Sequence, residues 1–335
     1  MLLRIIAARM ASAALMVALI SMLVFVVLRA LPIDPIGLSL PPGATEADRA
    51  ALTREFGLDR PVSQQYLLWV SGLLHGELGQ SVNLRRSVGP LVEAVLPATV
   101  ELVMFALLLG VVFGVAGGLV LFAIRRSRLE LVGDILTSVL VSVPEFVWAI
   151  GGILLFGVWL HALPFIGRID PDEAVPVLTG FMLLDTLATG RPAAFADAIA
   201  HLLLPAAALG LTLAPLVTRV LRSSLLGVIV EDFIHLARLR GLSEGQVLTR
   251  HALRNAALPT LSLIGVQAGF MFGGTLLVEV IFGWPGLGNL MVTAVRSGDI
   301  PVIQAATLVY CFIVLLITLG VDIATVALNP RLRSR

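Results

Sequence analysis

The chain has 335 residues, of which 58% are hydrophobic and only 13% are charged, and its mean hydropathy is +0.99. This composition excludes an ordinary soluble domain, in which about a quarter of the residues are charged. It predicts instead an all-α protein that crosses a membrane several times and is surrounded by lipid. The formal net charge is +1, so the chain has no basic excess of the kind that nucleic-acid binding requires.

Several chemistries are excluded by residue usage. All 23 basic residues are arginine, and a P-loop needs a lysine for the phosphates, so ATP and Mg must be bound by partner subunits if they are used at all. The single Cys311 supports neither a disulfide framework nor a cysteine metal site. The five histidines never fall at paired ligand spacing. No catalytic motif is present either, so we expect no metal, no cofactor and no enzymatic activity in this chain.

Six apolar runs are long enough, at about 20 residues, to cross a bilayer. In chain order they cover residues 10–28, 99–124, 132–160, 201–221, 258–282 and 302–328. Arginine is concentrated on one side of these runs: six arginines lie between Arg219 and Arg254, whereas the shorter loops on the other side hold only Arg168, Arg191 and Arg296. The positive-inside rule therefore predicts that both termini are cytoplasmic.

The first run exceeds the apolar core of a signal peptide and no Ala-x-Ala site follows it, so we expect it to be retained. Residues 1–98 would then form one region, made of the first membrane helix and an extracytoplasmic segment. Residues 99–335 would form a second region with five membrane helices and a cytoplasmic loop at 231–259. The least regular part, 167–200, is polar, and its apolar run 178–187 is too short to span and fits a surface helix.

Small residues recur every four positions in the second and fifth spans. Such stripes let helix backbones approach closely, so helix packing is the main interpretation, with sliding faces or an uncluttered pathway as the alternative. The residues are Gly110, Gly114 and Gly118 in the second span and Gly265, Gly269 and Gly273 in the fifth.

Four acids lie within or at the ends of the spans: Glu101, Glu145, Glu279 and Asp322. A charge in the bilayer costs roughly 3 kcal/mol even on lenient scales, so such residues face protein or water. They are candidates for the pathway or its gate, or else structural partners of arginine and backbone. Glu145 would favour a cationic group of the substrate.

The polar segment 231–259 reads as two short helices. Phe233, Leu236, Ala237 and Arg240 share one face by their spacing. Gly241 can end the first helix in a left-handed conformation. Ser243 and Gln246 form an S-x-x-Q capping box that starts the second helix, which runs through Arg250 and Arg254 toward Pro259.

The same segment carries a family resemblance. The runs Ala237-Arg238-x-Arg240-Gly241-Leu242-Ser243 and Arg250-His251-Ala252-Leu253-Arg254-Asn255-Ala256 are similar to the cytoplasmic signature of ABC-importer permeases in the dipeptide/oligopeptide/nickel family. The outer landmarks Asp59-Arg60-Pro61, Gln65-Tyr66 and Gly79-Gln80-Ser81 also resemble that family, so the resemblance covers nearly the whole chain.

The resemblance implies a type I ABC importer permease fold and a non-catalytic bacterial inner-membrane subunit. It also implies four kinds of partner: a homologous second permease, two ATP-binding subunits, an extracytoplasmic solute-binding protein and membrane lipid. In that family the loop couples the permease to the ATPase. The coupling residues it indicates here are Glu231, Asp232, Phe233, Leu236, Ala237, Arg238, Arg240, Gly241, Arg250, His251 and Arg254.

The sequence is compatible with more than one substrate, and two other classes of membrane protein are alternatives. Peptides are the favoured substrate of the resemblance, but nickel chelates and glutathione belong to the same class of permease. A self-sufficient secondary transporter should show repeated halves with matching broken helices, and no such duplication is seen. An intramembrane hydrolase needs a nucleophile and a base within the spans, which this sequence does not offer.

Overall fold

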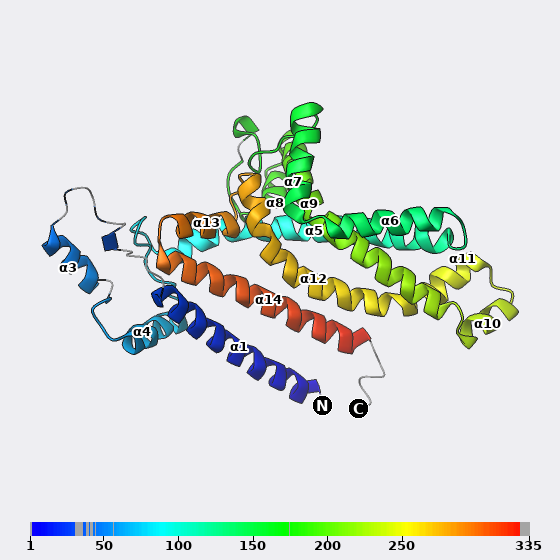
Figure 1. Ribbon diagram of the computed structural model, residues 1–335, viewed down its shortest axis with the longest axis horizontal. Helices are drawn as coiled ribbons and strands as arrows, with labels where there is room; N and C mark the ends of the chain where they lie inside the picture. Colours follow the sequence, from blue (N-terminus) through cyan, green and yellow to red (C-terminus); the bar gives the residue numbers. More distant parts are fainter. Residues whose placement is uncertain are drawn as a thin grey trace. The chain divides into compact units, whose positions relative to one another are not determined.

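The computed structural model describes residues 2–30, 36–37, 40, 43, 45–55, 57–173 and 175–328, and the regular elements of this described part are all helices (Figure 1). The chain divides into two compact units. One comprises Met1–Thr99 with Pro285–Leu315, and the other Val100–Trp284 with Leu316–Arg335. Pro285–Leu315 thus lies in the same compact unit as the N-terminal part of the chain.

The first unit holds the first membrane helix and the short helices that follow it. Its core is formed by Leu28, Val88, Val92, Leu287 and Val302 with their neighbours. The elements are α1 (Leu2–Ala30), α3 (Glu46–Glu55), α4 (Val62–Leu74), the start of α5 (Val88–Ala123), α13 (Leu287–Arg296) and the start of α14 (Ile300–Leu328).

The buried Asp299 joins distant parts of this unit. Its carboxylate accepts hydrogen bonds from the Ser81 hydroxyl, from the Val82 amide at 3.3 Å and from the Asn83 amide at 3.2 Å. A buried carboxylate is stable when it accepts several such bonds. These bonds hold the loop after α4 against the start of α14.

The second unit is built around α9 (Pro192–Val228), which packs against α6, α7, α8 and α12. The remaining elements are α6 (Leu129–Ser142), α7 (Glu145–Gly152), a π-helix η1 (Ile153–Trp159), a 3-10 turn η2 (Pro171–Glu173), α8 (Met182–Ala188), α10 (Asp232–Leu239), α11 (Glu244–Gln246), a π-helix η3 (Val247–Ala252) and α12 (Leu253–Ile281). The surface helix expected at 178–187 is thus observed as the shorter α8.

Five helices of the described part are long and apolar enough to span a membrane, and a sixth span arises if α6 and the helix from Glu145 to Trp159 count together. These two segments meet at 98°, and Figure 1 shows α7 turning away from α6. The predicted third span, 132–160, is therefore broken. The cause is Pro144, which keeps the preceding Val143 extended, at φ −96° and ψ 121°, and so ends α6.

Other prolines do not interrupt their helices. Pro205 and Pro215 lie inside α9, and Pro259 lies inside α12. The two helices predicted on either side of Pro259 consequently form one continuous helix that reaches Ile281. Within membrane proteins, neighbouring helices satisfy the backbone groups that an internal proline leaves unpaired.

The glycines of the second span lie against α9. A Cβ atom added at Gly114 would come within 2.6 Å of the Val217 Cβ atom, and one at Gly110 within 2.9 Å of the Leu213 Cβ atom. Gly118 is almost as close to Leu221, at 3.1 Å. The lack of side chains therefore allows α5 and α9 to approach closely.

The stripe in the fifth span is only partly a packing surface. A Cβ atom at Gly265 would lie 2.2 Å from a Val321 methyl group, and Gly269 is buried. Gly273, in contrast, has nothing within 4 Å of an added Cβ atom. Gly273 therefore faces open space within the described part of this chain, and its packing role stays a prediction.

Replacing Gly114 by valine is expected to lower the stability of the chain by about 1–3 kcal/mol, the usual effect of overpacking a tight contact. The added side chain would collide with Val217 and with the Ala214 carbonyl oxygen, 2.8 Å from the new Cβ atom. Thermal unfolding of the detergent-solubilised complex measures this loss. Gly273→Ala is the matched control, and equal midpoints for the two variants would contradict the packing role of Gly114.

Candidate coupling segment

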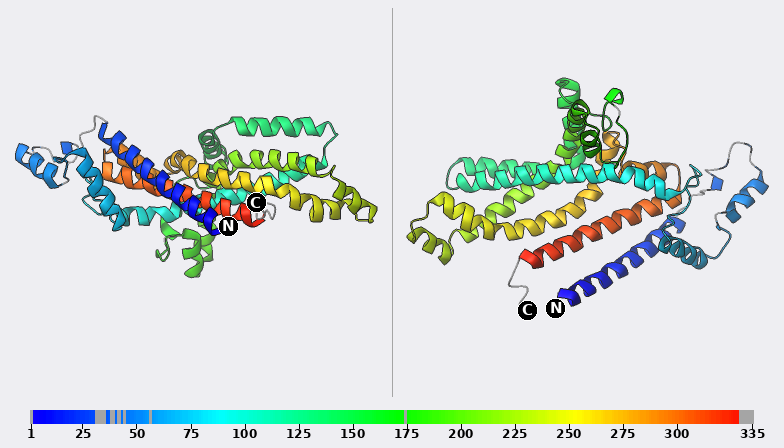
Figure 2. Two further views of the ribbon diagram at one scale, coloured as in Figure 1. Left: turned by 90° about the horizontal axis from the view of Figure 1, so that it is seen from below. Right: turned by 180° about the vertical axis from the view of Figure 1, so that it is seen from behind.

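Residues 231–259 follow the end of α9, and α10 begins at once. Glu231 is extended, at φ −71° and ψ 149°, and its carbonyl oxygen accepts the amide hydrogen of Ile234 at 3.0 Å. Both views of Figure 2 place α10 and α11 at the same end of α9 and α12. The segment is therefore a folded extension of two membrane helices.

Gly241 ends α10 in the left-handed conformation that the sequence predicts, with φ +80°. The Gly241 amide donates to the Arg238 carbonyl at 2.9 Å, and the Leu242 amide donates to the Ala237 carbonyl at 3.3 Å. This bond pair is the Schellman motif, which satisfies carbonyl groups at a helix end. The turn after α10 is consequently defined by its backbone.

The predicted capping box is also present. The Gln246 amide donates to the Ser243 hydroxyl, and the Gln246 side chain accepts the Ser243 amide hydrogen at 3.1 Å. The Arg238 guanidinium adds a fork to the Glu244 carboxylate, with distances of 2.7 and 3.2 Å. These bonds raise the pKa of Arg238 above its ordinary value. Arg238 therefore connects α10 to α11 within the segment. Its pairing with Glu244 was not indicated by the spacing of residues in the sequence.

One side of the segment is part of the core of the second unit. Ile234 and Ala237 of α10 pack together with Val247, Ala252 and Ala256 from the following helical stretch. The cluster is completed by residues from the ends of the long helices, namely Phe122 of α5 and Leu221 and Leu225 of α9. Because protein interiors are close-packed, a displacement of α10 must also move the ends of α5 and α9.

The opposite side of α10 is apolar but exposed. Phe233 is 40% exposed, Leu236 55% and Leu239 84%, whereas Ala237 is 5% exposed and Ile234 is fully buried. We call Phe233, Leu236 and Leu239 the outer face. The expectation that Ala237 shares this face is wrong, because Ala237 points into the core. Helical spacing groups Ala237 with Phe233 but cannot tell which side of a short helix with two apolar sides is buried.

The same segment also exposes charged residues. Glu231 and Asp232 are exposed at the start of α10, and Arg240 is exposed at its end. Arg250 and Arg254 are exposed on the following helix, where His251 is half-buried. An exposed apolar patch with a charged rim is typical of a protein contact surface.

Of the four acidic pathway candidates, Glu101 is fully engaged. Its buried carboxylate forms an ion pair with Arg168 and accepts the Leu183 amide hydrogen at 2.8 Å. Arg168 also donates to the Gly180 carbonyl at 3.1 Å and lies over the Trp284 ring. Glu101 thus joins α5 to the loop before α8.

The other three acids differ from one another. Glu279 is fully buried in α12, so its carboxylate is not accessible in this structure. Glu145 is half-buried at the start of α7, and its Oε1 atom would lie 3.0 Å from a Cβ atom added at Gly274. Its carboxylate therefore lies against the backbone of α12 at Gly274. The side chain of Asp322 lies outside the described residues.

No group of three or more histidine, cysteine, aspartate or glutamate side chains that could hold a metal ion occurs in the described part of the chain.

Two protein-family models together match nearly the whole chain. Residues 91–334 match the family described as binding-protein-dependent transport system inner membrane component, and residues 2–103 match the N-terminal family of the same membrane components. The di/tripeptide transport system permease protein DppB of Pseudomonas aeruginosa is 38% identical over 318 residues, 94% of each chain. The dipeptide transport system permease protein DppB of Escherichia coli is 38% identical over 324 residues, again 94% of each chain.

A solved structure supports the fold. The chain is similar to one in the inward-facing MetNI methionine ABC transporter, with a TM-score of 0.52 and 16% sequence identity. The match covers 69% of this chain and 93% of that one. The arrangement of helices is therefore that of an ABC importer permease.

Proposed function

The chain belongs to the inner membrane components of binding-protein-dependent transport systems, and we propose that it is the permease subunit of an ATP-driven importer of short peptides. It would line half of the translocation pathway, next to a homologous second permease. Two ATP-binding subunits, which bind ATP and Mg, would supply the energy, and an extracytoplasmic solute-binding protein would deliver the substrate. The positive-inside rule supports cytoplasmic termini in this arrangement.

The observation that carries the proposal is the two-sided character of α10. Its inner side is packed against α5 and α9, and its outer face exposes Phe233, Leu236 and Leu239. A short helix of this kind fits an apolar groove on a partner. The ATPase subunits of such importers are the partners that act on the cytoplasmic side.

The same packing suggests how force would be transmitted. Movement of an ATPase would displace α10, and the shared core with Leu221 and Leu225 would pass that displacement to α9 as a rigid-body rotation. The Schellman turn at Gly241 and the fork between Arg238 and Glu244 would prevent the loop from absorbing the motion. Coupling therefore depends on a stiff segment.

The substrate class follows from the relatives, whose names specify dipeptide and di/tripeptide transport. Uptake of a labelled dipeptide by proteoliposomes that contain this chain, the second permease, both ATPases and the binding protein tests the function. We expect uptake to require ATP and every subunit. Transport of a nickel chelate or of glutathione in place of dipeptides would overturn the peptide assignment, and uptake by this chain alone would overturn the permease assignment.

Glu145 is our candidate for a pathway residue. No hydrogen-bond partner for its carboxylate is present among the described residues, and it lies where α7 meets the glycines of α12. A carboxylate in such a place would attract the cationic amino terminus of a peptide. Gly273 would keep the adjacent space clear, which is the alternative role of the glycine stripe.

Replacing Glu145 by glutamine is expected to reduce uptake of dipeptides with a free amino terminus by about fivefold, the equivalent of roughly 1 kcal/mol for a lost charge interaction. Glu145→Asp keeps the charge and should restore most of the rate. The measurement is ATP-driven uptake by proteoliposomes, compared with an N-acetylated peptide. An unchanged preference for the free amino terminus in Glu145→Gln would exclude Glu145 from substrate selection.

A further inference from the structure

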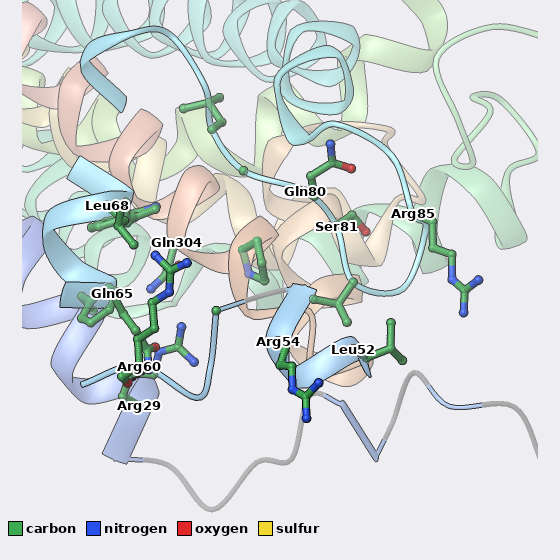
Figure 3. A pocket seen from close by; sticks show the side chains of 17 residues that line it. Arg29, Leu52, Arg54, Arg60, Gln65, Leu68, Gln80, Ser81, Arg85 and Gln304 are labelled. Carbon is green, nitrogen blue, oxygen red and sulfur yellow. Dashed lines mark hydrogen bonds between the residues drawn. The ribbon is translucent and has the colours of Figure 1, made fainter. Parts of the chain in front are cut away.

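A second feature, in the first unit, is independent of the coupling segment. A pocket of about 690 Å³ opens beside the end of α1, between α3, α4, the loop at 79–85 and the start of α14 (Figure 3). Four arginines, Arg29, Arg54, Arg60 and Arg85, line it, and the described lining residues include no acid. The pocket is therefore strongly positive.

Three hydrogen-bond donors of this pocket have no partner among the described residues. They are the buried Nε atom of Arg29, the Nε1 atom of Trp69 and the Nε2 atom of Gln304, and one acceptor of the pocket, the Oε1 atom of Gln65, is likewise without a partner. Gln304 is only 3% exposed, so bulk water does not satisfy its amide. Buried donors without an acceptor are rare in folded proteins, and three in one pocket indicate a bound acceptor group.

The surrounding side chains are held in place. The Trp69 ring packs against Phe25 at a tilt of 32° with the ring centres 5.5 Å apart, and the Arg29 guanidinium lies 5.3 Å from the centre of the Phe25 ring. Gln65 uses its amide hydrogens on the carbonyl groups of Leu58 and Arg60, at 3.4 and 2.7 Å. In Figure 3, Arg29, Arg60, Gln65 and Gln304 lie close together on the left of the view, and Arg85 lies on the right.

Guanidinium groups and amide donors together favour an oxyanion, because a phosphate offers several acceptor oxygens and pairs with arginine in a forked geometry. The position of the pocket indicates whether that phosphate belongs to a lipid headgroup or to a soluble anion. Arg29 lies in the last turn of a membrane span, so the pocket lies at headgroup depth.

The surface beside the pocket is apolar. Met22, Leu23 and Val26 of α1 and Leu67 and Leu68 of α4 are exposed. These side chains offer a surface for acyl chains, whereas a soluble anion would gain nothing from them. We propose that this pocket binds the phosphate group of an anionic phospholipid at the extracytoplasmic surface of the membrane that the chain crosses.

The experiment uses the assembled transporter purified in detergent and supplied with phosphatidylglycerol, with bound lipid counted by native mass spectrometry. The double variant Arg29→Gln/Arg60→Gln should bind phosphatidylglycerol about tenfold more weakly, as expected for lost charged hydrogen bonds. Gln304→Leu keeps every charge and should weaken binding severalfold, so it tests the pocket even if the double variant assembles poorly. Arg86→Gln, an exposed neighbour that does not line the pocket, should have no effect.

Three results would overturn the proposal. Equal losses in Arg86→Gln and in the double variant would mean that diffuse charge, not this pocket, attracts the lipid. Displacement of phosphatidylglycerol by a dipeptide with a free carboxylate, but not by its amide, would assign the pocket to substrate. Retention of phosphatidylglycerol by Gln304→Leu and by the double variant at the wild-type level would remove the site altogether. These experiments measure lipid binding and do not measure peptide uptake or ATPase coupling. The lipid proposal can therefore be wrong while the proposed transport function is right, and the reverse.

Discussion

Replacing Gly241 by valine is expected to abolish peptide-coupled ATP hydrolysis while the transporter still assembles. Gly241 has φ +80°, and an added Cβ atom would meet nothing within 4 Å. The penalty therefore comes from the backbone alone, at about 1–3 kcal/mol for a β-branched residue held in the left-handed region. Relief of that strain would reorient α10 and misplace its outer face. ATPase rates of the reconstituted complex, with and without substrate-loaded binding protein, measure the effect.

Gly245 provides a matched control. It also has open space around an added Cβ atom, but its φ is not positive. Gly245→Ala should be nearly silent, Gly241→Ala should be impaired, and Gly241→Asn should be milder than Gly241→Val because asparagine tolerates the left-handed region. Full substrate-stimulated ATP hydrolysis in Gly241→Val would show that the Schellman turn does not matter for coupling.

Truncating Phe233 to alanine is expected to weaken the association of the permease with its ATPase by more than about 1 kcal/mol, or at least fivefold. Phe233 is an aromatic residue on the exposed outer face, and residues of this kind contribute most at the centre of an interface. Binding of the purified ATPase to the permease pair in nanodiscs gives the dissociation constant.

Two further variants separate interface from fold. Ile234→Ala, next to Phe233 but fully buried, should cost about 2–5 kcal/mol of chain stability. Phe233→Ala should leave stability nearly unchanged because its side chain is already exposed. Arg250→Ala, at the charged rim, should cost less binding energy than Phe233→Ala. If Phe233→Ala lowered stability as much as Ile234→Ala while ATPase binding stayed constant, the outer face would not be a docking surface.

Features set by local geometry could be predicted from the sequence. The left-handed Gly241 and the capping box between Ser243 and Gln246 depend on four or five consecutive residues, and both are confirmed. The membrane helices follow from hydropathy, because lipid forces the backbone to satisfy its own hydrogen bonds. The break after α6 could also have been expected, since Val143 precedes Pro144.

Features that depend on long-range packing could not be predicted from the sequence. The apolar residues of α10 occupy two sides, and only contacts with Leu221 and Leu225 decide that Ala237 and Ile234 face inward. The ion pair of Glu101 joins residues 67 positions apart, and the pocket at Arg29 gathers residues from 25 to 304. The spacing of residues within one segment does not indicate contacts between residues that lie far apart in the sequence.

Docking of the outer face of α10 onto an ATPase subunit is tested most directly by a single crosslink. The natural cysteine is first replaced by Cys311→Ser, and cysteines are then placed by Leu236→Cys and in the apolar groove of the ATPase. Crosslinking of the active, assembled transporter is followed by measurement of its ATPase rate. We predict rapid disulfide formation at Leu236, loss of substrate-stimulated hydrolysis on oxidation and its recovery on reduction. Absence of any Leu236 crosslink in a complex that hydrolyses ATP and imports peptide would contradict the claim.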